Sequence, residues 1–313
     1  MSTLLKPRLS RWGRSVYEQE HHIASERDLL APYVEVVEDH ADADVIVVHS
    51  KQRVGEAELV KCPNVKMVIT TTSGFDHLDC AWMHTQGILP VRMPMLRRDA
   101  VVESILAMLL HANRRQEQFQ RDASCGKWTR GQLATYSPLR LQDQNIAVVG
   151  LGVIGQQLSK VLHFLGASVY GVDPCGIPEG LPFVKETSFD SLPTHVDVTL
   201  LTCTLNPTSA NMVNEAWLSQ CRGMTLINCA RGKLVDVERT LLALSQGNLS
   251  FLGLDVFPEE PYSQLASINE HKNLLFTPHA AGYHPHLGTQ IQQGLVDIIS
   301  RWVSNQSIPY IVE

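Results

Sequence analysis

The sequence predicts an α/β protein with two domains, each built on a parallel sheet. Three observations lead to this prediction. The chain has 313 residues, which is long enough for two hydrophobic cores. Short runs rich in β-branched residues alternate with helical stretches along most of the chain, an order typical of parallel sheets. One such run is followed by the glycine spacing GLGVIG, from Gly150 to Gly155.

The composition is that of an ordinary globular protein, with 44% hydrophobic and 19% charged residues. The net charge of -6 argues against nucleic acid or an anionic membrane as a general partner, and no apolar run has the length of a membrane span. The seven cysteines contain no CxxC pair, which favours reduced thiols in a cytoplasmic protein over disulfides or zinc. We therefore predict no metal site.

The N-terminal part of the chain is harder to interpret. Its first seventeen residues contain Lys and Arg but no acid, which fits either a targeting segment or a poorly packed arm. Pro7, Trp12 and Gly13 interrupt any amphipathic helix and favour the arm. Beyond it, we expect a helix from Glu26, strands over 33–39 and 43–50, a helix over 55–63 and a buried strand over 65–74.

A long helix is expected from Asp99, a suitable N-cap, to about Gln118. Its apolar residues cover more than one face, which is typical of a helix buried between two bodies. The polar stretch from Arg121 to Asp143 follows, with Trp128 as its one large anchor. An irregular segment of this length is usually functional or an oligomer contact.

The stretch from Asn145 to Asp173 is predicted to fold as strand, turn, helix and strand. Gly150 permits a tight turn, Gly152 lets the backbone approach a pyrophosphate, and Gly155 lets the helix pack close to the strand. Plain turns also use glycine, but the flanking strands and the terminal acid favour a dinucleotide site. The helix start at Val153 and Ile154 offers free N–H groups to phosphates.

Asp173 ends the second strand of this unit. A carboxylate there accepts hydrogen bonds from both ribose hydroxyls and repels a 2′-phosphate. NAD is therefore predicted in preference to NADP.

Four further strands bring the expected parallel sheet to about six strands; they lie at 196–203, 224–232, 249–257 and 273–279. Asn214 is expected to cap a short helix, and a second helix is expected over 235–246. A long helix over about 286–304 and a short strand-like segment close the chain.

Ligands of open α/β sheets bind beyond the carboxyl ends of the strands. Arg231, Glu260 and His279 follow three of these ends. An arginine can bind a substrate carboxylate and polarise its carbonyl, and a histidine can pass a proton to the developing alkoxide. A neighbouring carboxylate fixes the histidine tautomer. Each residue alone also fits a structural role, but together they favour hydride transfer at a 2-oxo acid.

The chain resembles the D-isomer-specific 2-hydroxyacid dehydrogenase family in five ordered motifs. The matching segments are TSGFDHLD from Thr72 for the substrate-carboxylate loop, GLGVIG with Asp173 for NAD, INCARGKLVD for the arginine, LDVFPEEP for the glutamate and TPHAAG for the histidine. The resemblance implies a Rossmann NAD-binding domain over 96–284, inserted into a flavodoxin-like substrate domain made of 1–95 and 285–313. It also implies a homodimer, with the loop around Trp128 in a dimer arm.

The resemblance also assigns roles to residues. Arg231 anchors and polarises the substrate, Glu260 pairs with His279, and His279 is the acid/base that also borders the cofactor. The backbone of Ser73 and Gly74 holds the substrate carboxylate. Further cofactor contacts fall on Thr204, Cys229 and Asp255, the last to the nicotinamide amide.

Several residues differ from the usual pattern of the family. Thr72 stands where a glycine is usual, Arg97 where a small polar residue is common, and Thr202 and Thr204 where a His and a Pro often occur. The first strand of the family is not obvious in this N-terminus. A small core residue is favoured over a redox sensor for Cys229.

The preferred function is an NAD-dependent oxidoreductase that interconverts a 2-oxo acid and its D-2-hydroxy acid, such as glyoxylate or hydroxypyruvate. The alternative is an NADH-sensing protein on the same fold that binds partners with little turnover. Arg97 and Arg98 are either a contact for a second anionic group of the substrate or, as is favoured, a solvent-exposed pair. A formate-oxidising activity is disfavoured because that branch has an amide at the position of Glu260.

Overall fold

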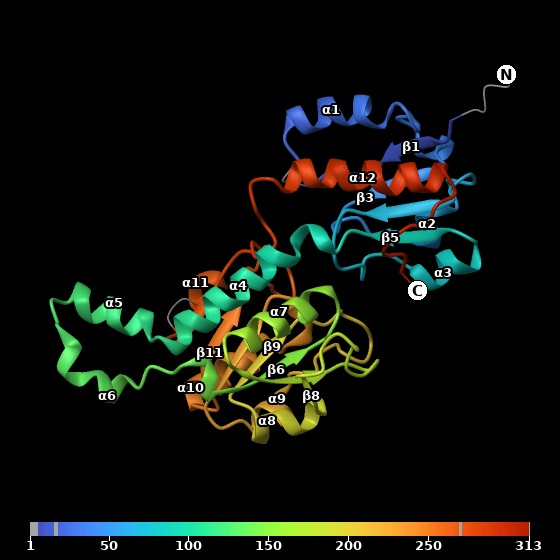
Figure 1. The fold of residues 1–313 in the computed structure, drawn as a ribbon. Coiled ribbons are helices and arrows are strands. Elements are labelled where there is room, and N and C mark those ends of the chain that lie inside the picture. Colours follow the sequence, from blue (N-terminus) through green and yellow to red (C-terminus); the bar gives the residue numbers. More distant parts are fainter. Residues whose placement is uncertain (1–5, 16–17, 269–270, 313) are drawn as a thin grey trace. The chain divides into compact units, whose positions relative to one another are not determined.

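The computed structural model describes residues 6–15, 18–268 and 271–312. They form two compact units, which are described in turn (Figure 1). Unit 1 consists of the described residues within Met1–Arg97 and Tyr283–Glu313, and unit 2 is Arg98–Gly282. The segment that forms unit 2 is therefore inserted in the sequence of unit 1.

Unit 1 contains a sheet of five parallel strands in the order β2-β1-β3-β4-β5. This is the flavodoxin-like strand order. The strands are β1 (Arg8–Arg11), β2 (Glu35–Val36), β3 (Val45–Val48), β4 (Met67–Thr70) and β5 (Leu89–Arg92). Every residue of β3 and β4 is buried, as expected for a sheet covered on both faces.

Helices cover both faces of this sheet. The alternation of side chains along β3 sends Val45 and Val47 into one core and Ile46 and Val48 into another. The first core also contains residues of α1 (Glu20–Leu30) and α12 (Leu287–Val303), and the second contains residues of α2 (Glu56–Leu59) and α3 (Cys80–Thr85). A short 3₁₀ helix, η1, spans His40–Asp42.

The prediction of a poorly packed N-terminal arm is wrong for residues 8–11, which form β1 between β2 and β3. Hydrophobicity did not reveal this strand because it reads RLSR. Leu9 and Ser10 are buried in the sheet, and the guanidinium of Arg11 is paired with Glu18 and Glu26. The helix that contains Glu26 begins at Glu20, earlier than expected. Residues 1–5 and 16–17 of the predicted arm lie outside the described residues.

Unit 2 contains seven parallel strands in the order β12-β11-β10-β9-β6-β7-β8. From β6 outward this is the Rossmann order, with one strand added at an edge. The strands are β6 (Asn145–Val149), β7 (Ser168–Val172), β8 (Lys185–Glu186), β9 (Val198–Leu201), β10 (Met224–Asn228), β11 (Leu249–Leu254) and β12 (Leu274–Phe276). The sequence did not predict β8, because its two residues are exposed and charged.

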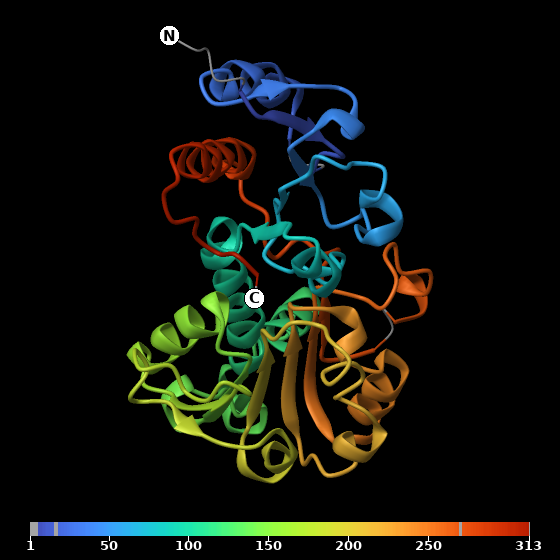
Figure 2. The ribbon, with the colours of Figure 1, turned by 90° about the vertical axis from the view of Figure 1, so that its right-hand side faces the viewer.

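Two hydrophobic cores lie on the two faces of the unit 2 sheet, and Figure 2 shows helices on both sides of its strands. The helices other than α4 to α6 are α7 (Val153–Phe164), α8 (Leu192–His195), α9 (Glu215–Leu218), α10 (Val237–Gln246) and α11 (Leu265–Ile268). Asn214 caps α9, as predicted, by accepting a hydrogen bond from Trp217 N–H. Short 3₁₀ helices η4 and η5 span Phe189–Ser191 and Gly232–Leu234.

The predicted helix from Asp99 to Gln118 is two helices. α4 (Met95–Asn113) begins before Asp99, so that residue is not the N-cap. The chain turns at Arg115, whose φ of 52° lies in the left-handed region, and α5 (Gln116–Ser124) follows. The sequence did not reveal this break, because apolar residues recur with the helical period on both sides of it.

The stretch from Arg121 to Asp143 is more regular than predicted. After α5 come the 3₁₀ helix η2 (Thr129–Gln132), α6 (Leu133–Tyr136) and the 3₁₀ helix η3 (Leu141–Asp143). Trp128 is 88% exposed, so it does not anchor the segment within unit 2. We call residues 114–140 the arm; α5 and α6 extend away from the unit 2 sheet in Figure 1.

Candidate active site

The glycine turn lies where the strand order of unit 2 reverses. It follows β6, which pairs with β7 on one side and β9 on the other, and this is the position at which such sheets bind ligands. Gly150 has a φ of +93°, and a Cβ there would lie 2.5 Å from the Cα of Cys203. A Cβ on Gly155 would lie 1.9 Å from the carbonyl oxygen of Gly150. Both glycines are therefore required by the packing of the turn.

Gly152 differs from these two, because a Cβ added to it would meet no protein atom within 4 Å. It is also the N-cap of α7, and having no side chain it makes no capping hydrogen bond to the first N–H groups of that helix. Open space beside unbonded N–H groups at a helix start is what a pyrophosphate requires. These residues fit the pyrophosphate of NAD.

The carboxylate of Asp173 holds the glycine turn in place. Oδ2 accepts a hydrogen bond of 2.7 Å from Leu151 N–H, and Oδ1 accepts one of 2.9 Å from Cys175 N–H. Each oxygen keeps a lone pair for another donor. Asp173 thus fits a ribose diol as well as the turn.

Arg231 lies in a tight turn after β10. The Asn228 side chain shapes this turn, since its Oδ1 accepts from Ala230 N–H at 3.0 Å and its Nδ2 donates to Arg231 O at 2.8 Å. A Cβ on Gly232 would lie 1.9 Å from the carbonyl carbon of Phe257. The turn is therefore in direct contact with the segment that follows β11 and leads to Glu260.

Glu260 and His279 are in contact, with Oε2 and Nδ1 2.7 Å apart. Phe257 N–H donates to the other oxygen, Oε1, at 3.1 Å. Partial burial raises the pKa of Glu260, but hydrogen bonding to His279, the His279 charge, the Phe257 N–H and the Arg231 charge outweigh it, so the pKa lies below its ordinary value. The Arg231 charge is thus one of the influences that lower the pKa of Glu260.

His279 adopts a φ of +54°, which is unusual for a residue with a side chain. The buried carboxylate of Asp255 holds this segment: its Oδ1 accepts from Thr277 Oγ1 at 2.5 Å, from Ala280 N–H at 2.8 Å and from Ala281 N–H at 3.1 Å. His279 N–H donates to the backbone oxygen of Asp255 at 2.7 Å. The sequence did not predict this positioning role of Asp255, nor those of Asn228 and Gly232.

The other predicted cofactor contacts lie at the ends of the central strands. Thr204 is exposed after β9, where Ser209 Oγ donates to its backbone oxygen at 2.7 Å. Cys229 follows β10 directly, with its Sγ 4.0 Å from the Sδ of Met108. Burial, with a contribution from Asp255, raises the pKa of the Cys229 thiol well above its ordinary value, which disfavours a reactive thiolate.

Ser73 and Gly74 lie in unit 1, in the turn that follows β4. Arg97 donates to the backbone oxygen of Thr71 in this turn, and Arg98 pairs with Asp99 at 2.7 Å. The interpretation of Arg97 and Arg98 as a solvent-exposed pair is therefore wrong, because both residues are partly buried, Arg97 against the turn and Arg98 in its ion pair with Asp99.

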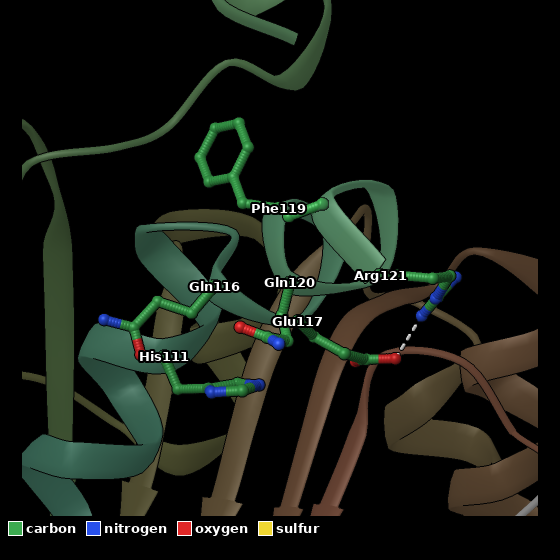
Figure 3. Close-up of a pocket in the computed structure, with 7 residues that line it drawn as sticks. His111, Gln116, Glu117, Phe119, Gln120 and Arg121 are labelled. Atoms are coloured by element: carbon green, nitrogen blue, oxygen red, sulfur yellow. Dashed lines mark hydrogen bonds and ion pairs between the residues drawn. The ribbon is translucent and has the colours of Figure 1, made fainter. Parts of the chain in front are cut away.

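A cavity of about 770 Å³ lies between the end of α4 and α5 (Figure 3). It contains none of the predicted site residues; its lining is His111, Gln116, Glu117, Phe119, Gln120, Arg121 and Ala123. Among the described residues, no group of three or more His, Cys, Asp or Glu side chains is arranged to hold a metal ion. No helix in the described part of the chain is long and apolar enough to cross a membrane.

Residues 106–281, more than half of the chain, match the family model for the NAD binding domain of the D-isomer specific 2-hydroxyacid dehydrogenases. The chain belongs to this family. The predicted family is therefore confirmed, and so is the presence of an NAD-binding domain in the chain, whereas its bounds at 96–284 stay a prediction.

Curated relatives carry several activities in their names. The chain is 33% identical over 255 residues to erythronate-4-phosphate dehydrogenase of Proteus mirabilis, covering 79% of this chain and 60% of the relative. It is 28% identical over 251 residues to D-3-phosphoglycerate dehydrogenase of Methanocaldococcus jannaschii, covering 78% and 47%. The chain thus spans about half the length of these relatives.

Solved structures share the fold over almost the whole chain. D-lactate dehydrogenase of Aquifex aeolicus, solved with NAD and lactic acid, has a TM-score of 0.81 at 23% identity, covering 95% of this chain and 96% of that one. An acyclic imino acid reductase, solved with NADPH and D-Arg, has a TM-score of 0.82 at 20% identity, covering 97% and 100%. The predicted fold class is confirmed.

Proposed function

We propose that the protein is an NAD-dependent oxidoreductase that interconverts a 2-oxo acid and the matching D-2-hydroxy acid. One observation carries this proposal: a cation, a carboxylate and an imidazole follow neighbouring strands β10, β11 and β12 of an NAD-binding domain, and the imidazole and carboxylate are in hydrogen-bond contact. Membership of a dehydrogenase family supports it.

NAD, when bound, supplies or accepts the hydride at C2 of the substrate. Arg231 binds the substrate carboxylate and polarises the C2 carbonyl, for which a guanidinium is well suited. His279 gives a proton to the C2 oxygen during reduction and takes it back during oxidation. Nδ1 of His279 is bonded to Glu260, so Nε2 is the atom that exchanges the proton.

Glu260 holds the imidazole of His279 in one orientation through the bond to Nδ1. Its lowered pKa keeps the carboxylate ionised at neutral pH, and a carboxylate at 2.7 Å stabilises the imidazolium electrostatically. Asp255 has a positioning role, because its carboxylate bonds to Thr277, Ala280 and Ala281 around His279.

The cofactor residues are assigned to unit 2. Gly150, Gly152 and Gly155 form the turn for the pyrophosphate, with the N–H groups at Val153 and Ile154, and Thr204, Cys229, Asp255 and His279 border the nicotinamide end. Asp173 binds the adenosine ribose and disfavours a 2′-phosphate, so NAD is proposed over NADP. We assign unit 1 as the substrate domain, in which Ser73 and Gly74 donate to the substrate carboxylate.

The substrate is proposed to be small, such as glyoxylate or hydroxypyruvate. A relative that supports this choice is glyoxylate reductase of Thermofilum pendens, which is 26% identical over 256 residues, covering 79% of this chain and 74% of the relative. A panel of 2-oxo acids, with NADH and NADPH compared, tests the proposal. NADH oxidation with at least one acid is expected, and a preference for NADPH would contradict the role of Asp173.

The alternative, an NADH-sensing protein, predicts a different outcome of the same panel. It requires tight NADH binding without turnover on any acid. Measuring NADH affinity by fluorescence alongside the rate assay separates the two functions.

We also propose a homodimer formed through the arm. Trp128, Leu133 and Leu139 of the arm are exposed apolar residues, and grouped exposed apolar residues usually mark an interaction surface. The cavity at the base of the arm is lined largely by α5, and the ring of Phe119 packs edge-on against Tyr136 of α6, with the ring centroids 5.3 Å apart. The cytoplasmic location stays a prediction from the cysteines.

A further inference from the structure

The turn after β4 has bonded carbonyl oxygens. Met93 N–H donates to Thr72 O at 3.1 Å, and Arg92 Nη1 donates to Ser73 O at 3.3 Å. Arg97 donates to the carbonyl oxygen before these, that of Thr71. The acceptors of the turn are thus directed into unit 1.

The backbone N–H groups of the same turn differ from its carbonyl oxygens. Among the described residues, the N–H groups of Ser73, Gly74 and Phe75 have no hydrogen-bond partner. In a trans peptide the N–H points opposite to the preceding C=O. The bonds to Thr72 O and Ser73 O therefore direct the N–H groups of Ser73 and Gly74 away from Met93 and Arg92, and successive N–H groups of this kind form a binding site for an anion.

A row of hydrogen bonds through two threonine hydroxyls reaches the next carbonyl oxygen of the turn, that of Gly74. Thr72 Oγ1 donates to Gly74 O at 2.8 Å. Thr70 Oγ1 lies 2.8 Å from Thr72 Oγ1 and 2.9 Å from His77 Nε2. All three side chains are at most 9% exposed, so water does not substitute for these bonds.

Counting protons shows which atom donates in each of these hydrogen bonds. A carbonyl only accepts, so the one hydroxyl proton of Thr72 goes to Gly74 O. Thr70 must then donate to Thr72, and His77 must donate to Thr70 from a protonated Nε2. Hydrogen bonds aligned in one direction strengthen each other, and the result holds the peptide between Gly74 and Phe75 in one orientation.

We propose that Thr72, fixed by Thr70 and His77, is a positioning residue for the carboxylate of the substrate. It keeps the Gly74 carbonyl turned inward. A glycine peptide can otherwise rotate at low cost and present a carbonyl oxygen that repels an anion. Since the family usually has glycine at position 72, this device belongs to the present chain. The inference rests on the proposed function of Ser73 and Gly74 as carboxylate-binding groups.

The test compares isosteric hydroxyl deletions in the complete enzyme with NADH bound. Thr72→Val removes the donor to Gly74, and Thr72→Ser keeps it. Thr71→Val is the matched control, because the adjacent Thr71 hydroxyl is buried and has no partner among the described residues. The readouts are KM and kcat for the best substrate of the panel, and the Kd of oxamate, a non-reducible 2-oxo acid analogue.

We expect Thr72→Val to raise KM and the oxamate Kd roughly five- to tenfold, the effect of about one hydrogen bond. The turnover rate and the affinity for NADH should change little. Thr72→Ser and Thr71→Val should behave like the wild type. If Thr72→Val does not fold, Thr70→Val removes the hydrogen bond to the Thr72 hydroxyl and should also raise the oxamate Kd.

An unchanged oxamate Kd in Thr72→Val, or an equal loss in Thr71→Val, would overturn the inference. So would a failure of the wild-type holoenzyme to bind oxamate. Oxamate binding without turnover of any 2-oxo acid would contradict the proposed function and leave the role of Thr72 intact.

Discussion

At the scale of single residues, Asp255 shows how one buried carboxylate orders a reactive loop. Its Oδ1 accepts three hydrogen bonds from residues on either side of His279. These bonds offset the cost of a positive φ at His279, which is of the order of 1 kcal/mol or more. Asp255 therefore orders the loop that carries His279.

Asp255→Asn should lower the free energy of unfolding by roughly 2 kcal/mol, since hydrogen bonds to a charged group are lost. The turnover rate should fall because His279 loses its support. Urea denaturation and steady-state rates measure the two effects. Asp197→Asn is the control, because Asp197 also accepts a backbone N–H, from Asn145 at 2.8 Å, but at an exposed site. Equal losses in both variants would contradict the account.

Glu260→Gln keeps a hydrogen-bond acceptor for His279 but removes the negative charge. The charge beside His279 is then lost while a hydrogen bond is kept, so kcat/KM in the reductive direction should fall roughly tenfold at neutral pH. Steady-state kinetics is the measurement, and an unchanged kcat/KM would refute the role of the Glu260 charge.

The same variant has a predictable effect on stability. The pKa of Glu260 in the folded protein lies below its ordinary value of 4.5. The ionised carboxylate therefore stabilises the fold above pH 4.5, and this contribution is lost as the pH falls through the lower, folded-state pKa. The difference in free energy of unfolding between wild type and Glu260→Gln should be present at pH 7 and vanish in acid. A difference that grows in acid would contradict this sign.

At the scale of elements, the glycines of the turn after β6 have different roles, two in packing and one in the proposed binding of the cofactor. Gly150 and Gly155 are fixed by contacts within the protein, whereas Gly152 faces open space at the start of α7. The three glycines of one motif are therefore required for different reasons, and their substitutions should be distinguishable.

Gly152→Ala should leave the melting temperature nearly unchanged but weaken NADH binding by about tenfold or more, because its Cβ would occupy the space proposed for the pyrophosphate. Gly180→Ala is the control, since a Cβ there also meets nothing within 4 Å. Calorimetry and NADH titration are the measurements. If Gly152→Ala bound NADH as tightly as the wild type, the assignment of the pyrophosphate to the space beside Gly152 would be wrong.

Elements with a strong apolar pattern could be predicted, and others could not. The central strands β3, β4, β9 and β10 are buried at every residue, and each was expected from sequence. β1 was missed because its Arg11 is buried through ion pairs with distant acids. The start of α4 was missed because Asp99 is a good cap that the fold uses inside a helix.

At the scale of the whole molecule, the arm exposes a large apolar side chain to solvent. Trp128 is 88% exposed there. The length of the stretch from Arg121 to Asp143 indicated either a functional segment or an oligomer contact, and in the structure this stretch contains the end of α5 followed by η2, α6 and η3.

Trp128→Lys should convert the proposed dimer to a monomer, because burying a charge at an apolar contact is costly. Phe164→Lys is a matched control, since Phe164 is also 88% exposed but lies at the end of α7, outside the arm. Light scattering after size exclusion gives the mass of each variant. A monomeric wild type, or dissociation in both variants, would contradict the assignment of the arm.

The candidate site was predictable only in part. Parallel strands bring their carboxyl ends to one edge, so Arg231, Glu260 and His279 could be proposed together from sequence. The supports around them depend on distances between loops, such as the contact of Gly232 with Phe257. No local pattern in the sequence encodes such distances.

The most direct test of the proposed activity is His279→Asn, compared with the wild type for the turnover rate in the reductive direction and for NADH affinity. Asparagine tolerates the positive φ at this position, so the loop should keep its shape while proton transfer is lost. We predict that the turnover rate falls by about a hundredfold or more, with NADH affinity nearly unchanged. A turnover rate close to that of the wild type would contradict the assignment of His279 as the acid/base.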